Sequence, residues 1–237
     1  MTLRSALSLM PTAFATLLAL ATASSHAANV QVRTKAVADA NISQHINLGS
    51  GTVPLGARTY LYEIAPAGTQ ASSLVQFDLS AWAGLQLQGD AQLDMTYLSM
   101  YYSNSVDLSI RPVGAAWNEA SVTWANFSNN LGAPVGGGTV TSAGNASGSH
   151  VLFSLPQALV QQWIDVPSSN HGLIIQATSG RTMIFASREY RPTGGLVGAY
   201  APQLNFAAAP VPEAESWALM ATGLLALGAL MRRRRAG

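Results

Sequence analysis

The sequence predicts an all-β protein: an antiparallel β-sandwich of the jelly-roll type with one short helix, a signal helix at the N-terminus and a hydrophobic helix at the C-terminus. Two observations predict the sandwich. Short runs of alternating apolar and polar residues recur through the centre of the 237-residue chain, and Gly, Asn, Ser and Pro separate them, which is typical of strands joined by turns. Helical periodicity is clear in only one central segment.

The expected strands follow one another along the chain. In VDLSIRPV, for example, Val106, Leu108 and Ile110 share one face, because side chains alternate between the two faces of a strand. The runs expected to form strands are VQVRTKAV, SSLVQFDLS, AQLDMTYLSMYY, VDLSIRPV, HVLFSL, GLIIQAT, RTMIFAS and PQLNFAA. The Gly-, Ser- and Thr-rich segment 135–148 is expected to form either a long loop or a weak edge strand.

The segment SLPQALVQQWI predicts the single short helix of the sandwich. Leu155, Leu159 and Trp163 recur every four residues, which places them on one face of a helix. Ser154 and Gln157 have the spacing of a capping box, in which each side chain bonds a backbone N–H at the helix start. No internal repeat is evident, so residues 28–206 are expected to fold as one domain.

Residues 1–27 have the pattern of a secretory signal peptide. Arg4 supplies a positive charge, an apolar core follows, and the sequence Ser-His-Ala then fits the small-x-small rule of signal peptidase. We therefore expect cleavage between Ala27 and Ala28 and export of the remaining chain. The alternative is an N-terminal membrane anchor that is not cleaved.

The C-terminal region, residues 207–237, ends in an apolar stretch and four arginines. As a helix, Trp217–Met231 would rise about 22 Å, which is shorter than a hydrocarbon core of about 30 Å. Arginines beside a membrane segment stay on the cytoplasmic side, while a signal peptide sends the central domain outward. Both ends of the chain therefore predict the same orientation in the inner membrane.

This tail resembles the PEP-CTERM protein-sorting signal of Gram-negative bacteria. The residues that carry the resemblance are Val211, Pro212, Glu213, Trp217, Arg232, Arg233, Arg234 and Arg235. The resemblance implies that an exosortase, a membrane-embedded thiol peptidase, removes the helix and releases the protein to the cell surface or the extracellular space. Such systems accompany exopolysaccharide production. Ala214 stands where the signal has its second proline, and a permanent short anchor is the alternative.

Charge and cysteine content exclude several functional classes. The formal net charge is +1, but five arginines lie in the two terminal segments. Residues 28–211 carry seven basic and nine acidic side chains, a net charge of −2, so no basic patch is expected to bind nucleic acid. The chain has no cysteine, which excludes disulfides, thiolate metal sites and thiol nucleophiles.

Four blocks of the central domain resemble, in order, the DNRLRE-type domain, a jelly-roll module related to a family of carbohydrate-binding modules. The blocks are SSLVQFDLS, IRPVGAAWNEASVTWANF, LVQQWIDVPSSNHGLII and MIFASREYRPTGGLVGAYAPQL. They cover residues 74–206, and the resemblance implies a non-catalytic sugar-binding domain. Asp39 and Asn41 match the opening of that domain, whereas its usual tyrosine and Asn-Tyr-Gly motif are missing from the N-terminal third.

Four side chains are candidates for ligand contacts: Trp117, Glu119, Trp124 and Arg188. The two tryptophans either stack on sugar rings or belong to the core, and we favour the core, because tryptophans beside a turn usually supply buried area. Glu119 either accepts hydrogen bonds from sugar hydroxyls, binds a metal or caps the turn backbone.

The sequence does not determine which carboxylate forms an ion pair with Arg188. Arg188 and Glu189 would point to opposite faces if they lay in a strand, so a pair between them is not assumed. Asp165 and Asp78 are the alternative partners, although Asp78 is favoured to form an Asx turn with the residues after it.

Five tyrosines form an aromatic set that either stacks on sugar rings from an exposed sheet face or packs across strands, and packing across strands is the more common arrangement. They are Tyr60, Tyr62, Tyr97, Tyr101 and Tyr102.

Motifs for catalysis and cofactors are missing from the sequence. It contains neither a His-Glu-x-x-His zinc motif nor a Gly-x-Ser-x-Gly elbow, and no pair of carboxylates is singled out for glycoside hydrolysis. We therefore expect no enzyme and no cofactor. A structural calcium ion bound by Asp and backbone oxygens stays an option, without an Asp-rich loop to support it.

Together these features predict a non-catalytic protein, exported and sorted by an exosortase, that binds or organises exopolysaccharide. Its expected partners are signal peptidase, the exosortase, the inner membrane before sorting, and exopolysaccharide, with no nucleic acid. The alternatives are a purely structural surface or matrix protein without a sugar site and a small polysaccharide-active enzyme.

Overall fold

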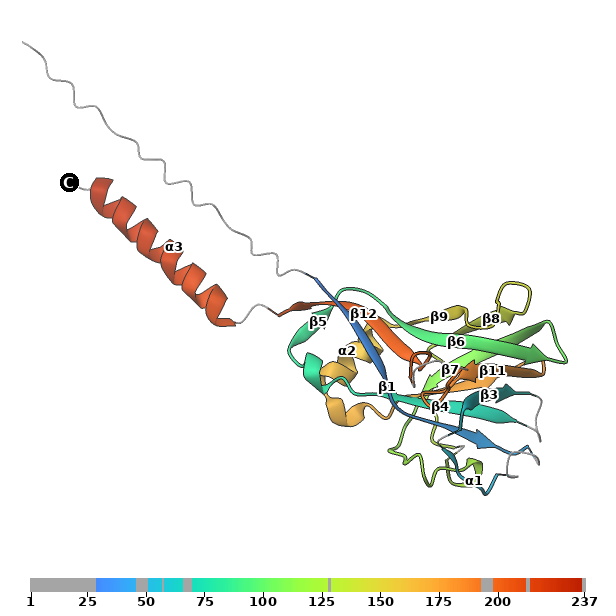
Figure 1. Ribbon diagram of the computed structural model, residues 1–237. Helices are drawn as coiled ribbons and strands as arrows, with labels where there is room; N and C mark the ends of the chain where they lie inside the picture. The colour runs from blue at the N-terminus through green and yellow to red at the C-terminus, as the bar shows by residue number, and fades with distance from the viewer. Residues whose placement is uncertain are drawn as a thin grey trace, which may run out of the picture.

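The computed structural model describes residues 29–45, 51–56, 58–65, 70–127, 129–192, 198–211 and 214–235, without the side chains of 214–220, 229, 230 and 235. Nearly all regular structure up to residue 210 is antiparallel β-strand (Figure 1). The predicted all-β sandwich class is therefore confirmed. The expected signal helix, the cleavage site Ala27–Ala28, Pro212 and Glu213 lie outside the described residues.

The described residues contain twelve strands. They are β1 Val30–Ser43, β2 Leu55–Gly56, β3 Tyr60–Ile64, β4 Ala71–Phe77, β5 Leu85–Leu87, β6 Ala91–Tyr101, β7 Ser105–Pro112, β8 Gly136–Thr141, β9 His150–Leu155, β10 Leu173–Ala177, β11 Thr182–Ala186 and β12 Gln203–Pro210. The helices are α1 Trp124–Phe127, α2 Gln157–Asp165 and α3 Ala214–Arg235, with short 3₁₀ turns at Ser80–Trp82 and Pro167–Ser169.

Six of these strands close into a ring. The order is β1–β12–β6–β11–β3–β4, and β4 pairs back with β1. Closure removes free sheet edges within the ring. β10, β7 and β8 continue outward from β4, while β9 adds to β6, β5 to β12 and β2 to β1. The Gly-rich segment forms the edge strand β8, paired with β7, so the edge-strand alternative is correct.

Strand β1 pairs with two different strands of the ring, β12 and β4, because it bends at a bulge. Its first half, Val30–Lys35, pairs with β12, and its second half pairs with β4 after a register shift between Ala36 and Ala38. A bulge adds a residue to one strand and turns it. Asp39 follows the bulge directly, so the bend determines where its side chain lies.

The core is made by the inward-facing residues of the alternating strands. Leu93, Met95 and Tyr97 of β6 all face it, as a period of two requires. A second, smaller apolar cluster lies beneath the loop between β7 and β8, and Val122 and Phe127 of that loop belong to it.

Helix α2 confirms the predicted helix, but the predicted capping box is wrong. Strand β9 continues to Leu155, so Ser154 is extended and its side chain does not cap the helix. Instead, Asp90 Oδ1 accepts the backbone N–H of Gln157 at 3.0 Å, and Asp90 Oδ2 accepts the Ser154 hydroxyl at 3.2 Å. The cap therefore comes from the turn before β6, which is distant in sequence.

The expected apolar stripe on α2 is only partly correct. Trp163 is buried in the core and Leu159 packs against it. Val160 and Ile164 are also fully buried, while Leu155 contributes to the core from β9 rather than from the helix.

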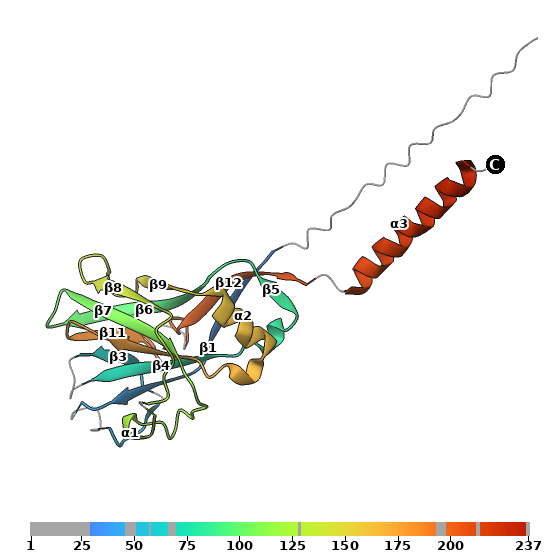
Figure 2. The same ribbon diagram turned by 180° about the vertical axis from the view of Figure 1, so that it is seen from behind.

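The predicted C-terminal helix is present as α3, which is longer at both ends than Trp217–Met231. Figures 1 and 2 show it projecting away from the strands. Among the residues that the structure describes, no helix combines the length and the apolar character that crossing a membrane requires.

Candidate functional site

A hollow of about 520 Å³ lies on the outer face of β3, β11 and β6, and four tyrosines line it. We call it the tyrosine hollow. Its lining residues are Tyr60, Tyr62, Leu98, Ser99, Tyr101, Ser147, Thr182, Ile184 and Tyr190. None of these side chains is acidic or basic, so the surface offers aromatic rings and neutral hydroxyls to a ligand.

Strand register brings these residues to one face. Tyr60 and Tyr62 are two residues apart in β3, while Leu61 between them faces the core. Tyr62 lies opposite Ile184, and Ile184 lies opposite Ser99 of β6. The pairing of β6 with β11 shifts register between Ile184 and Phe185. The shift changes the alternation along β6, so Ser99 lies on the outer face together with Ile184.

The tyrosine rings support one another. The ring centroids of Tyr60 and Tyr62 are 6.2 Å apart with nearly perpendicular planes, and those of Tyr60 and Tyr190 are 5.8 Å apart. Tyr190 also packs edge-on against Tyr200 at 5.7 Å. Contacts of this kind orient the rings, while Tyr60 stays 39% exposed and Tyr101 50% exposed.

The other two tyrosines of the predicted set lie elsewhere. Tyr97 is buried in the core, and Tyr102 projects into solvent from the turn after β6. Tyr190 was not part of the predicted set because it follows β11 in an irregular turn, where no alternation pattern marks the exposed face. Of the two alternatives for this set, Tyr60, Tyr62 and Tyr101 thus lie on an outer sheet face, where Tyr60 and Tyr62 also pack against each other.

A second feature is an ionic cluster around Arg188, in the turn after β11. The guanidinium donates from Nη2 to Glu119 Oε2 at 3.0 Å and from Nε to Glu189 Oε1 at 2.8 Å. Nη1 donates to the carbonyl of Val37, and the backbone N–H of Arg188 donates to Asp39 Oδ2 at 2.7 Å. Arg188 therefore links three segments that are distant in sequence.

The partner of Arg188, which the sequence left open, is its neighbour Glu189. Both residues lie in a turn, so the opposition of faces in a strand does not apply. Asp78 instead accepts the backbone N–H of Ser80 at 2.9 Å, which confirms the Asx turn. Asp165 accepts a hydrogen bond from Gln161 on its own helix.

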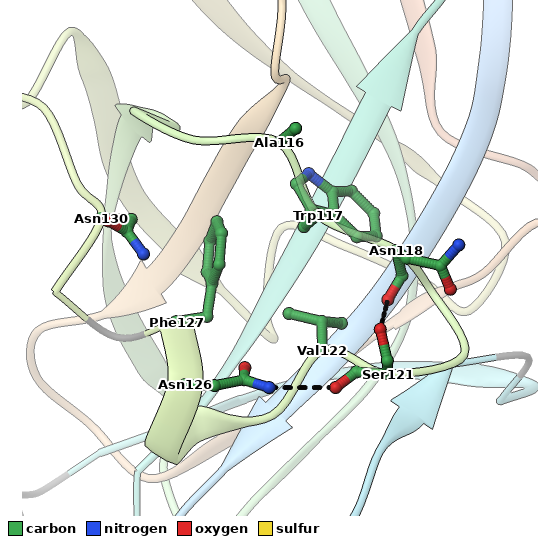
Figure 3. A pocket seen from close by; sticks show the side chains of 8 residues that line it. All are labelled: Ala116, Trp117, Asn118, Ser121, Val122, Asn126, Phe127 and Asn130. Atoms are coloured by element: carbon green, nitrogen blue, oxygen red, sulfur yellow. Dashed lines mark hydrogen bonds between the residues drawn. The ribbon is translucent and has the colours of Figure 1, made fainter.

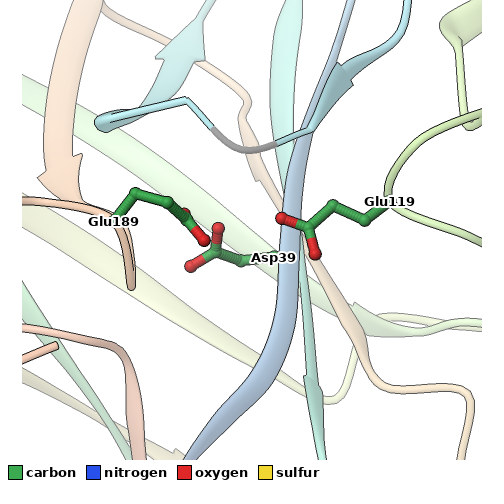
Figure 4. Close-up of side chains that lie close together, drawn as sticks. All are labelled: Asp39, Glu119 and Glu189. Carbon is green, nitrogen blue, oxygen red and sulfur yellow. The ribbon is translucent and has the colours of Figure 1, made fainter. Parts of the chain in front are cut away.

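Three carboxyl groups meet at this cluster (Figure 4). One oxygen from each of Asp39, Glu119 and Glu189 lies within 4.8 Å of the other two. Oxygens that bind one Ca²⁺ at about 2.3–2.6 Å lie no more than about 5 Å apart, so these three residues, all within the described part of the chain, could hold a cation. Arg188 already supplies a positive charge to Glu119 and Glu189.

Protonation of Asp39 is an alternative to a bound cation. Its side chain is 1% exposed, and burial raises its pKa to about 8, against the backbone hydrogen bond from Arg188, which lowers it. The nearby charges of Glu189 and Glu119 raise the pKa further. A protonated Asp39 therefore coexists with the two glutamates without any ion.

The four candidate residues do not form one site. Trp117 lines a different hollow of about 440 Å³, together with Asn118, Phe127 and other residues of the same loop (Figure 3). Its Nε1 donates to the carbonyl of His171 at 2.8 Å. Both Trp117 and Trp124 are partly buried and pack against the smaller core cluster, in line with the favoured core reading.

Glu119 is held by backbone packing as well as by Arg188. A Cβ at Gly56 would lie only 2.1 Å from the carbonyl oxygen of Glu119, so the loop approaches β2 too closely for any other residue. The turn itself is capped by Asn118, whose Oδ1 accepts the backbone N–H of Ala120 at 2.9 Å.

Comparison with known proteins gives a family match. The sequence matches the family described as Carbohydrate-binding module family 96 over residues 22–194. This range is more than half of the chain, and it contains the tyrosine hollow and the Arg188 cluster. No curated protein matches the chain.

Proposed function

The chain belongs to carbohydrate-binding module family 96, and we propose that it is a non-catalytic domain that binds a polysaccharide in the tyrosine hollow. The observation that carries this proposal is the exposed group of Tyr60, Tyr62, Tyr101 and Tyr190 around one concave surface. Binding sites typically combine aromatic walls with a few polar groups that fix orientation. Ser99, Ser147 and Thr182 supply such groups here.

The chemistry of the hollow favours a neutral glycan. A pyranose ring presents an apolar face of C–H groups and a rim of hydroxyls, which matches aromatic rings flanked by neutral donors and acceptors. Burial raises the pKa of Tyr62 above its ordinary value, so its hydroxyl stays a donor at neutral pH. A uronate chain would find no cationic partner among the lining residues.

The carboxyl cluster does not support the enzyme alternative. A glycosidase needs two carboxyl groups, about 5–9.5 Å apart, that both reach the scissile bond. Here Asp39 is 1% exposed and lines neither of the hollows beside Arg188. Its raised pKa has burial as its first cause, and Glu119 and Glu189 are held by Arg188.

The proposal extends to where the protein works. Residues 1–27 and the tail from Val211 to Arg235 have the patterns of an export signal and of an exosortase signal, which supports a surface or extracellular protein that organises exopolysaccharide. Mass spectrometry of the protein from its producing cells tests this part. Loss of residues 1–27 and of Arg232–Arg235 is expected, and an intact arginine cluster in the mature product would refute sorting by cleavage.

Retention of the purified chain in gels that contain polysaccharide tests the binding function. Neutral polymers (dextran, hydroxyethyl cellulose and galactomannan) and an acidic one (alginate) cover the main classes. We expect the chain to be retarded by at least one neutral polymer. Free migration in every gel would favour the purely structural alternative.

A further inference from the structure

The carboxyl cluster of Asp39, Glu119 and Glu189 does not line the tyrosine hollow. Its members come from distant parts of the chain: Asp39 from β1, Glu119 from the loop between β7 and α1, and Glu189 from the turn after β11. In Figure 4 the two glutamates approach from opposite sides, with Asp39 between them. Three chain segments thus converge on one group of carboxyl oxygens.

Two oxygens of this cluster are buried acceptors that receive no hydrogen bond. Asp39 Oδ2 accepts the backbone N–H of Arg188, and Glu189 Oε1 accepts a hydrogen bond from the guanidinium. The second oxygen of each group, Asp39 Oδ1 or Glu189 Oε2, is buried, and no donor among the described residues reaches it. Because a buried acceptor without a partner is costly, these two atoms point to a proton or a cation between the carboxyl groups.

The charges in contact within the cluster do not balance. Three ionised carboxyl groups carry −3 and the guanidinium of Arg188 carries +1, which leaves a net charge of −2. Asp39 is only 1% exposed, and a buried charge needs compensation. A proton on Asp39 leaves a net charge of −1, whereas one divalent cation neutralises the cluster.

The ligand atoms suit a hard cation. The group consists of three carboxylates without histidine, and the chain has no cysteine, so the soft or nitrogen ligands that zinc prefers are not offered. Ca²⁺ takes about six to eight oxygen ligands in a flexible geometry. Mg²⁺ requires a nearly ideal octahedron and gives up its water reluctantly. Ca²⁺ is therefore the ion that this cluster fits best.

The backbone holds the carboxyl groups in place. Asp39 directly follows the bulge of β1, and the backbone N–H of Glu189 donates to Ser187 Oγ at 3.1 Å. A Cβ at Gly56 would lie 2.5 Å from Cγ of Glu119, so the side chain of Glu119 packs directly against β2. Ligands positioned in this way lose little conformational freedom on binding, which favours affinity.

Solvent reaches the cluster on the side of the two glutamates. Their side chains are 19% exposed for Glu119 and 26% exposed for Glu189. Glu119 lines a hollow of about 440 Å³ on one side of Arg188, and Glu189 lines another of about 360 Å³. An ion can therefore enter past the glutamates, and water in these hollows can supply the ligands that three carboxylates do not.

We propose that Asp39, Glu119 and Glu189 bind one Ca²⁺ ion, which joins β1, the loop after β7 and the turn after β11. The ion takes the place of the proton on Asp39, which passes to solvent, and no covalent bond between heavy atoms forms or breaks. Arg188 keeps its contacts, because a carboxylate can bond a guanidinium through one oxygen and a cation through the other. The inference does not depend on glycan binding.

Titration of the metal-free chain with CaCl₂ tests the site. The purified chain is treated with EDTA, dialysed and titrated by calorimetry at about pH 8.5, because the pKa of Asp39 is about 8 and its proton then competes little. We expect a single site with a dissociation constant below about 1 mM, as for extracellular calcium modules. Excess Ca²⁺ should raise the unfolding midpoint by about 5 °C.

The variant Asp39→Asn separates the ion from the fold. Asparagine keeps an oxygen for the Arg188 N–H and resembles the protonated acid, so the fold is expected to persist, which the unfolding midpoint without Ca²⁺ checks. Binding should weaken at least about tenfold, because a neutral oxygen replaces a charged one. Glu189→Gln, which keeps an acceptor for Arg188, should act in the same direction. Asp165→Asn, at an exposed aspartate of α2, is the matched control and should bind like the wild type.

Three results would overturn the inference. If the wild-type chain shows neither heat nor a higher unfolding midpoint up to about 10 mM Ca²⁺, a proton on Asp39 holds the cluster instead. If Asp39→Asn and Glu189→Gln both bind Ca²⁺ like the wild type, the ion lies elsewhere. If Mg²⁺ binds more tightly than Ca²⁺, the assignment of the ion is wrong. Retention in polysaccharide gels measures the proposed function separately, so either proposal can fail alone.

Discussion

The guanidinium of Arg188 bonds the carboxylate of Glu189, its neighbour in the chain, with Nε 2.8 Å from Oε1. The same guanidinium reaches Glu119 in the loop after β7, and the Arg188 backbone bonds Asp39 in β1. Because its hydrogen-bonding groups are already used within the protein, Arg188 holds three segments together. This role differs from the ligand contact for which the residue was a candidate.

Substitution Arg188→Ala should lower the free energy of unfolding by about 1–3 kcal/mol, because it removes charge-assisted hydrogen bonds and leaves two partly buried carboxylates without a counter-charge. Urea unfolding measures the loss. Arg188→Lys keeps the charge but not the planar fork, so its loss should be smaller. The control is Arg191→Ala, at an exposed arginine three residues on. A stability equal to that of this control would contradict the role given to Arg188.

The burial of Glu63 should make the stability of the protein depend on pH. Its side chain faces inward from β3 and is fully buried, and burial raises its pKa well above the ordinary 4.5. Above about pH 4.5, Glu63 releases its proton in the unfolded chain but keeps it in the folded chain. The free energy of unfolding therefore falls as the pH rises toward the folded pKa. Glu63→Gln has no proton to release, and its stability relative to the wild type should increase with pH.

Urea unfolding of both proteins at about pH 5 and about pH 8 measures this difference. Asp39, whose pKa is also raised, is present in both proteins, so its contribution cancels in the comparison. A difference between the two proteins that stays constant with pH would show that Glu63 is ionised in the folded state.

The N-terminus of α2 depends on Asp90. Replacing Asp90 with alanine should cost about 1 kcal/mol, the usual value of a helix cap, while Asp90→Asn keeps an acceptor for the Gln157 N–H and should cost less. Ser154→Ala should change stability by less than about 0.5 kcal/mol, since Ser154 does not cap the helix. Thermal unfolding measures these losses. A larger loss for Ser154→Ala than for Asp90→Ala would show that Ser154 caps the helix after all.

Binding at the tyrosine hollow should be insensitive to salt. Its lining carries no charged side chain, and salt screens only charged contacts. Raising the salt from about 50 mM to about 500 mM should change the dissociation constant for the retained neutral polymer less than about twofold. A tenfold weakening would point to ionic contacts, and therefore to arginines rather than tyrosines.

Much of the fold follows from local pattern. Alternation in β6 and β7 marked both the strands and the faces they bury, because the period of two is visible in the sequence itself. Strand β3, which carries Tyr60 and Tyr62, was not among the expected strands. Helix α2 was also recognisable from its own residues.

Contacts between distant segments could not be predicted in this way. The Asp90 cap depends on how the turn before β6 packs against α2, and the position of Asp39 depends on the bulge between Ala36 and Ala38. Tyr190 lies in a turn where no periodicity applies.

The most direct test of the central claim is the affinity of tyrosine variants for the neutral polymer that retards the wild-type chain. Tyr60→Ala and Tyr101→Ala should each weaken binding about tenfold, and the double variant should weaken it about a hundredfold. Each substitution removes the apolar contact that one ring makes with the sugar. Val166→Ala, at a residue 48% exposed and outside the hollow, should bind like the wild type. A double variant that folds and still binds with wild-type affinity would contradict the claim that this hollow binds the glycan.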